Sequence, residues 1–69
     1  MTMLKVIEVL AESSVSWEDA AQVAATNAAK TVRNIRSITV VNQQATVGAD
    51  GKIDSYRINA KISFEIEDA

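Results

Sequence analysis

Amide and basic side chains are gathered in two neighbouring segments, and those that could contact a ligand are Asn42, Gln43, Gln44, Arg57, Asn59 and Lys61. Arg57, Asn59 and Lys61 alternate with apolar residues, which places them on one face of a strand. Arginine can hold a carboxylate or a phosphate through two parallel hydrogen bonds. The two segments could therefore bind an anionic ligand such as a nucleotide phosphate. A polar contact between subunits explains the same pattern equally well.

Acidic side chains offer a second kind of site, and the candidates are Glu8, Glu12, Asp50, Asp54, Glu65, Glu67 and Asp68. Calcium takes six to eight oxygen ligands, so several carboxylates would have to meet. Asp50 and Asp54 flank a turn, but the surrounding residues do not form an EF-hand loop. An oligomer could bring carboxylates from several subunits around a symmetry axis. Solvated surface acids are the simpler interpretation of the pattern.

The chain contains no histidine and no cysteine, so the ordinary general base, the thiol nucleophile, disulfides and the usual zinc ligands are missing. No spacing supports serine–lysine or carboxylate catalysis, and we expect no enzymatic activity. A chain of 69 residues would bury only about 60% of the surface that its unfolded form exposes. Chains this small usually need an additional source of stability. We therefore expect the protein to form an oligomer of identical copies.

Charge and hydropathy exclude two classes of partner. The net charge is −2 and the basic residues form no patch of the kind that neutralises phosphates, so nucleic-acid binding is not expected. The longest uncharged run, Ala20 to Ala29, is well short of the roughly 20 apolar residues that cross a bilayer. The first ten residues lack the pattern of a secretory signal. We expect a cytoplasmic protein that does not enter the membrane.

Hydrophobic periodicity predicts four elements: a strand at Met3–Glu12, a helix at Ser16–Ser37, a strand at Ile38–Val47 and a strand at Ile53–Glu67. The helix should begin at Ser16, whose hydroxyl can accept a backbone N–H three residues later, in a capping box with Asp19. Basic residues near the predicted helix end, Lys30, Arg33 and Arg36, would complement the helix dipole. An Asp-Gly pair at 50–51 predicts a tight hairpin between the last two strands.

The predicted helix carries an apolar stripe for packing on the sheet, small in the middle and bulky at both ends, at Trp17, Ala21, Ala25, Ala28, Val32 and Ile35, flanked by Ala20 and Ala24. Trp17 on this stripe should belong to the core or to a subunit contact, and the same applies to Tyr56 and Phe64 on the apolar face of the last strand. The helix returns the chain between the first two strands, and the hairpin reverses it again. If the third strand lies between the other two, every neighbouring pair is antiparallel, which gives the sheet order 1-3-2. We therefore expect one α+β domain over residues 1–69, a β-α-β-β unit with one helix on a three-stranded antiparallel sheet.

The chain resembles the dodecins over nearly all of its length. The matching segments are KVIEVL at 5–10, SxxSWEDAA at 13–21, AAKTVRNIR at 28–36, VVNQ at 40–43 and YRINAKISFEIE from 56. The resemblance implies a β-α-β-β protomer assembled into a hollow homododecamer of cubic symmetry. It also implies a small-ligand binding and storage protein without catalysis, usually for a flavin such as FMN, riboflavin or FAD.

Two positions depart from the flavin-binding pattern of that family. In flavin-binding dodecins a tryptophan directly after the helix stacks on the isoalloxazine ring, and a glutamine on the last strand bonds its polar edge. This chain has Ser37 and Arg57 at those places. Without the aromatic ring, a bound flavin loses about 0.5–1.5 kcal/mol of stacking energy beyond that of the buried area. Arginine also lacks the oxygen acceptor that the glutamine side chain offers to the flavin ring N–H. Flavin is thus a weakened expectation.

The candidate contacts to a bound ligand are Ser37, Arg57, Asn42 and Gln43. Dodecin-like proteins without the stacking tryptophan include calcium binders. An assembly that binds a divalent cation, or one that is purely structural, is therefore the alternative to flavin storage.

Overall fold

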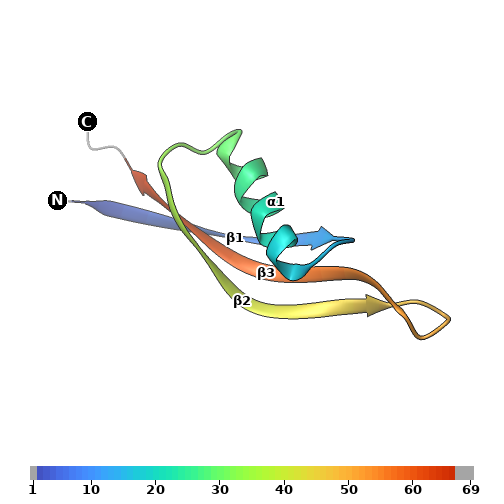
Figure 1. Cartoon of the computed structure of the whole chain (residues 1–69). Helices are drawn as coiled ribbons and strands as arrows, with labels where there is room; N and C mark the ends of the chain where they lie inside the picture. Colours follow the sequence, from blue (N-terminus) through green and yellow to red (C-terminus); the bar gives the residue numbers. More distant parts are fainter. Residues whose placement is uncertain (1, 67–69) are drawn as a thin grey trace.

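The computed structural model describes residues 2–66, in which one helix lies across one face of a three-stranded sheet (Figure 1). The elements are β1 (Met3–Ser13), α1 (Trp17–Ala29), β2 (Ile35–Val47) and β3 (Ile53–Ile66). The sheet order is β1-β3-β2, and both outer strands run antiparallel to β3. The predicted β-α-β-β order, the single helix and the 1-3-2 sheet are confirmed. Glu67, the predicted last residue of the third strand, lies outside the described residues.

The core is thin and lies between α1 and the middle of the sheet. Its buried apolar side chains among the described residues are Ala20, Ala24, Ile58, Ala60 and Ile62. The alternation predicted for the last strand is confirmed, because the buried residues of β3 are every second one. On the helix, however, burial is greatest at Ala20 and Ala24, whereas Ala21 and Ala25 are only half-buried. Two methyl groups at the contact allow the helix to approach the sheet closely.

The helix is shorter than the sequence pattern predicts. The predicted range Ser16–Ser37 is wrong at its end, because α1 stops at Ala29 and Lys30 is its C-cap. Two β-branched residues, Thr31 and Val32, follow the cap, and such residues lose side-chain freedom in a helix. Asn34 then adopts a left-handed conformation with φ 61°, and β2 begins one residue later. Val32, Ile35, Arg33 and Arg36 therefore do not belong to the helix, and its last turn contains no basic residue.

The start of α1 agrees with the predicted cap. The Ser16 hydroxyl accepts the backbone N–H of Asp19 at 2.9 Å. The Asp19 carboxylate does not complete the box on Ser16; instead it accepts the hydroxyl of Ser13 at 2.6 Å. Ser13 is the buried polar residue of the described chain, and its oxygen also accepts the backbone N–H of Val15 at 2.9 Å. The turn between β1 and α1 is thus fixed by side chains.

The two strand pairs of the sheet differ in regularity. β1 pairs with β3 in one unbroken register, whereas the β2–β3 pairing shifts at three places, after Ile35, after Val40 and after Thr46. Gly51 takes a positive φ of 82° in the hairpin, as the Asp-Gly pair predicts, and the Gly48 N–H donates to the Lys52 carbonyl at 2.8 Å. Within the described residues, no helix has the length and hydropathy needed to span a membrane.

Candidate functional site

The sheet face that α1 leaves uncovered carries the residues with binding potential, and we call it the outer face. Ile58, Ala60 and Ile62 point towards the helix, so the residues between them point to the opposite side. The pairing of the strands arranges this side in cross-strand rows: Glu12–Arg57–Gln44, Leu10–Asn59–Asn42, Glu8–Lys61–Thr39 and Val6–Ser63–Ser37. The outer face is therefore polar along β3 and β2 and apolar at several positions of β1.

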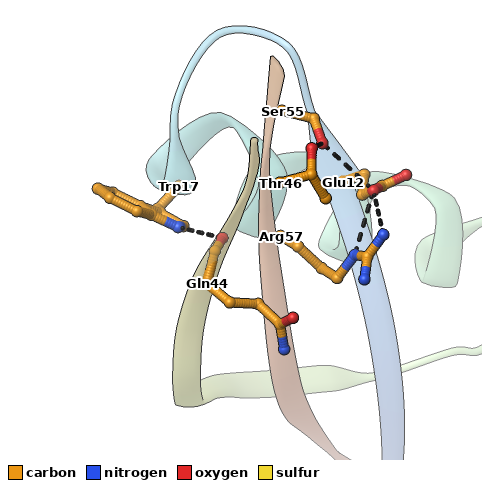
Figure 2. A network of polar contacts seen from close by, with 6 residues as sticks. All are labelled: Glu12, Trp17, Gln44, Thr46, Ser55 and Arg57. Carbon is orange, nitrogen blue, oxygen red and sulfur yellow. Dashed lines mark hydrogen bonds and ion pairs between the residues drawn. The ribbon is translucent and has the colours of Figure 1, made fainter. Parts of the chain in front are cut away.

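Arg57 and Glu12 form an ion pair at one end of the outer face (Figure 2). Arg57 donates through Nη2 at 2.7 Å and through Nε at 3.1 Å, both to Oε1 of Glu12. The same oxygen accepts the Ser55 hydroxyl at 3.3 Å, and Ser55 shares a further hydrogen bond with Thr46 at 2.6 Å. The hydrogen bonds and the charge of Arg57 hold the pKa of Glu12 below its ordinary value of 4.5. An anion that approached Arg57 would have to displace this carboxylate.

Ser37 lies on β2, on the outer face, and is exposed. Its hydroxyl bonds to that of Ser63, its partner on β3. Ser63 and Arg57 are six residues apart on the same strand, which corresponds to about 20 Å at the rise of a β-strand. Ser37 and Arg57 therefore share a face but lie at separate places along it.

The two amide candidates lie on opposite sides of the sheet. Asn42 pairs with Asn59 on the outer face, between the rows of Ser37 and Arg57. Gln43 pairs with Ile58 and faces the helix side, where its side chain is exposed. The structure thus brings Ser37, Asn42 and Arg57 to one face and separates Gln43 from them.

Asn59, which the sequence places with Arg57 and Lys61 on a polar strand face, has the most unusual environment on the outer face. Its Oδ1 atom is buried and has no hydrogen-bond partner within the described chain. A buried acceptor without a donor is costly. The burial of this atom depends on the pairing of β3 with its two neighbouring strands, so no sequence pattern could reveal it.

All three aromatic side chains of the protein lie on the helix side of the sheet. Trp17 packs against the core cluster, which confirms its predicted structural role, and its indole N–H donates to the Gln44 carbonyl at 2.9 Å (Figure 2). Trp17 and Tyr56 meet edge to face, with ring centroids 5.0 Å apart. Phe64 alternates with Ile62 and shares its side. With one Trp, one Tyr and one Phe in the whole sequence, the outer face has no ring for stacking.

Carboxylates do not gather into a metal site within one protomer. In the described part of the chain, no three acidic, histidine or cysteine side chains are close enough to hold an ion together. Glu12 is paired with Arg57, and Glu65 lies 3.7 Å from Arg36. Asp50 accepts the backbone N–H of Lys52 in the hairpin. Glu8 is an outer-face carboxylate that forms no hydrogen bond or ion pair within the described structure. It lies opposite Lys61 in the pairing of β1 with β3.

Comparison with known proteins decides the family. The family model for dodecin matches residues 3–67. This chain belongs to the dodecin family. The match spans the helix, all three strands and both faces of the sheet, so the residues described above lie within it.

Individual dodecins differ in their similarity to this chain. This chain is 39% identical over 69 residues to a protein named calcium dodecin from Mycobacterium tuberculosis, and the match covers 100% of this chain and 96% of the relative. The crystal structure of that calcium dodecin, described as calcium chelating with a novel calcium-binding site, matches with a TM-score of 0.81 and 37% identity over 97% and 94% of the two chains. A Thermus thermophilus dodecin matches with a TM-score of 0.91 and 26% identity over the whole of both chains. The fold is thus common to relatives that are 26% and 37% identical to this chain.

Proposed function

We propose that this dodecin is a non-catalytic protein that assembles from copies of itself and binds a divalent cation, with calcium as the first candidate. The observation that carries the proposal is the chemistry of the outer face, which offers oxygen atoms and no aromatic ring. The whole chain would act as one domain, and we expect it to work in the cytoplasm. The 39% identical relative named calcium dodecin supports the same choice of ligand.

Oxygen donors suit a hard cation such as calcium. The outer face presents the Ser37 and Ser63 hydroxyls and the Glu8 carboxylate. These groups are too few for one protomer to supply six to eight ligands. We therefore place the cation where outer faces of several copies meet around a symmetry axis, with Glu8 as the charged ligand.

Assembly is supported by the shape and surface of the protomer. Its radius of gyration is 14.3 Å, whereas a compact domain of 69 residues would have about 11 Å. Ten large apolar side chains among the described residues are exposed: Met3, Leu4, Val6, Leu10, Val15, Val40, Val41, Val47, Ile53 and Ile66. Surfaces of this kind mark contacts between proteins. A homododecamer of the family type would cover them.

A flavin is a weaker candidate than calcium on this surface. Stacking on an aromatic side chain is absent at Ser37, and Arg57, the other expected contact, is held by Glu12. A flavin would therefore have to bind through polar contacts alone. The small-ligand role expected from the sequence is kept, with an ion in place of the ring system.

Titration of chelator-treated protein with calcium tests the proposal. We expect heat of binding by calorimetry and a higher melting temperature with calcium than with chelator, since calcium at 100 times its Kd would add about 2.7 kcal/mol of stability. Glu8→Gln should weaken calcium binding, and Glu18→Gln, an exposed carboxylate in the first turn of α1, serves as the control. Absence of any calcium effect, together with quenching of riboflavin fluorescence at micromolar protein, would show that flavin is the ligand.

A further inference from the structure

Arg57 lies in a shallow recess at one end of the outer face. The recess has a volume of about 260 Å³ and is lined by Leu10, Ala11, Glu12 and Arg57. Pockets for drug-sized ligands begin at about 300 Å³, so this one suits a smaller molecule. Leu10 is 70% exposed and gives the recess an aliphatic wall. The recess thus combines a guanidinium group, a carboxylate and an apolar surface.

The contact between Arg57 and Glu12 matches only part of what the guanidinium group can bind. Nε and Nη2 of Arg57 both donate to the same oxygen of Glu12, Oε1. The other oxygen, Oε2, accepts no hydrogen bond within the described residues, and Figure 2 shows it turned away from Arg57. Arginine binds an oxyanion most strongly when two of its nitrogens each meet a separate oxygen. Glu12 therefore occupies this edge of Arg57 with an incomplete set of contacts.

We propose that this edge of Arg57 is a binding site for a small organic phosphate, and that Glu12 occupies the site while the ligand is absent. A phosphate monoester has three terminal oxygens and a charge of about −1.5 to −2 near neutral pH. It offers separate oxygens to Nε and Nη2, and its charge exceeds that of a carboxylate. A phosphate can therefore displace Glu12, whereas a ligand carboxylate would only equal it.

Displacement of Glu12 costs little because the ion pair is partly exposed. The side chains of Arg57 and Glu12 are 38% and 51% exposed. Exposed ion pairs contribute little to stability, and water can hydrate the released carboxylate. Ser55 would lose its 3.3 Å bond to Glu12 but would keep the 2.6 Å bond that it shares with Thr46. The exchange therefore leaves neither the carboxylate nor the hydroxyl without a partner.

Gln44 adds a hydrogen-bond donor next to Arg57. It lies opposite Arg57 in the pairing of β2 with β3, and Figure 2 shows its side-chain amide on the same side of the sheet as the guanidinium group. The NH₂ of an amide is a donor for phosphate oxygens, and Leu10 would contact the organic group of the ligand. Glu8, the proposed calcium ligand, lies two cross-strand rows away. Phosphate binding is thus a separate property of the outer face from the proposed calcium binding.

Calorimetric titration with butyl phosphate in calcium-free buffer tests the proposal. The natural protein should bind it, and Glu12→Gln should bind it about two- to fivefold more tightly, the difference expected when a competing exposed ion pair is removed. Arg57→Lys keeps the positive charge but lacks the two-nitrogen edge, so it should lose most of the binding. Glu18→Gln removes one negative charge at an exposed position of α1 and should change nothing.

Carboxyl NMR of the natural protein detects the displacement without any substitution. Saturating butyl phosphate should shift the carboxyl carbon resonance of Glu12 and leave that of Glu18 unchanged. Equal affinity of the natural protein and Glu12→Gln, with no shift at Glu12, would show that the carboxylate does not occupy the site. Binding that persists in Arg57→Gln would place the phosphate elsewhere. Absence of binding in both the natural protein and Glu12→Gln would overturn the phosphate site itself.

Discussion

The ion pair of Arg57 with Glu12 determines whether its charge is available to a ligand. By sequence it is an available cation on a polar strand face, suited to an anionic ligand. In the structure it lies opposite Glu12 in strand register and binds one oxygen of that carboxylate with two nitrogens. The pairing of β1 with β3 decides this, and the two residues are 45 positions apart in the chain. Sequence periodicity could assign Arg57 to a face but could not identify its neighbour.

The Glu12–Arg57 pair should make stability depend on acid pH. The folded-state pKa of Glu12 lies below 4.5, so the contribution of the pair is present above pH 4.5 and is lost as the pH falls through the lowered pKa. Glu12→Gln should therefore lower the melting temperature slightly near neutral pH and have no effect at the acid end. Carboxyl NMR titration of Glu12 gives the pKa directly, and Arg57→Gln should raise it towards 4.5. An unchanged midpoint in Arg57→Gln would contradict the assignment.

Ser37 is the residue at which a ring would restore flavin stacking. It is exposed on the outer face beside Ser63, so a larger side chain there has room. Ser37→Trp should increase riboflavin affinity by about two- to twelvefold, the equivalent of 0.5–1.5 kcal/mol of aromatic stacking. Fluorescence quenching measures the change. Gln43→Trp adds the same ring on the helix side of the sheet and should have no effect; a gain there instead would show that ligands bind the other face.

At the scale of elements, the ends of α1 show what local sequence can and cannot determine. Its start follows from Ser16, because N-caps act through bonds to residues two or three positions away. Its end does not follow from hydrophobic spacing, since Val32 and Ile35 continue the stripe in sequence but belong to the next segment and to β2. Asn34 was the available signal, because asparagine is tolerated in the left-handed conformation that ends helices.

The Ser16 cap should have a measurable effect on stability. Ser16→Ala removes the acceptor for the Asp19 N–H and should cost about 1 kcal/mol in the free energy of unfolding. Urea denaturation at fixed protein concentration measures it, because an oligomer's stability depends on concentration. Ser14→Ala is the matched control in the same turn, where the described structure shows no bond from the side chain, and it should be nearly neutral. Equal costs would indicate that the turn as a whole, rather than the cap, is sensitive.

At the scale of the whole molecule, topology was predictable because each step depended on local signals. The period-two pattern of β3, the Asp-Gly turn and one capped helix leave few arrangements, and the antiparallel order 1-3-2 is one of them. The candidate site was less predictable. The distance between Ser37 and Arg57, the unpartnered oxygen of Asn59 and the recess at Arg57 all depend on which strands meet and in which register.

The thin core has a consequence for the life of a newly made chain. The five buried aliphatic side chains of residues 2–66, two of them isoleucine and three alanine, offer little to hold an isolated copy folded. A chain leaving the ribosome would stay open to proteases until it met others, and its survival would rise with the rate of its own synthesis. At low expression most chains would be degraded before they assembled. The amount of assembled protein would therefore rise more than proportionally with expression.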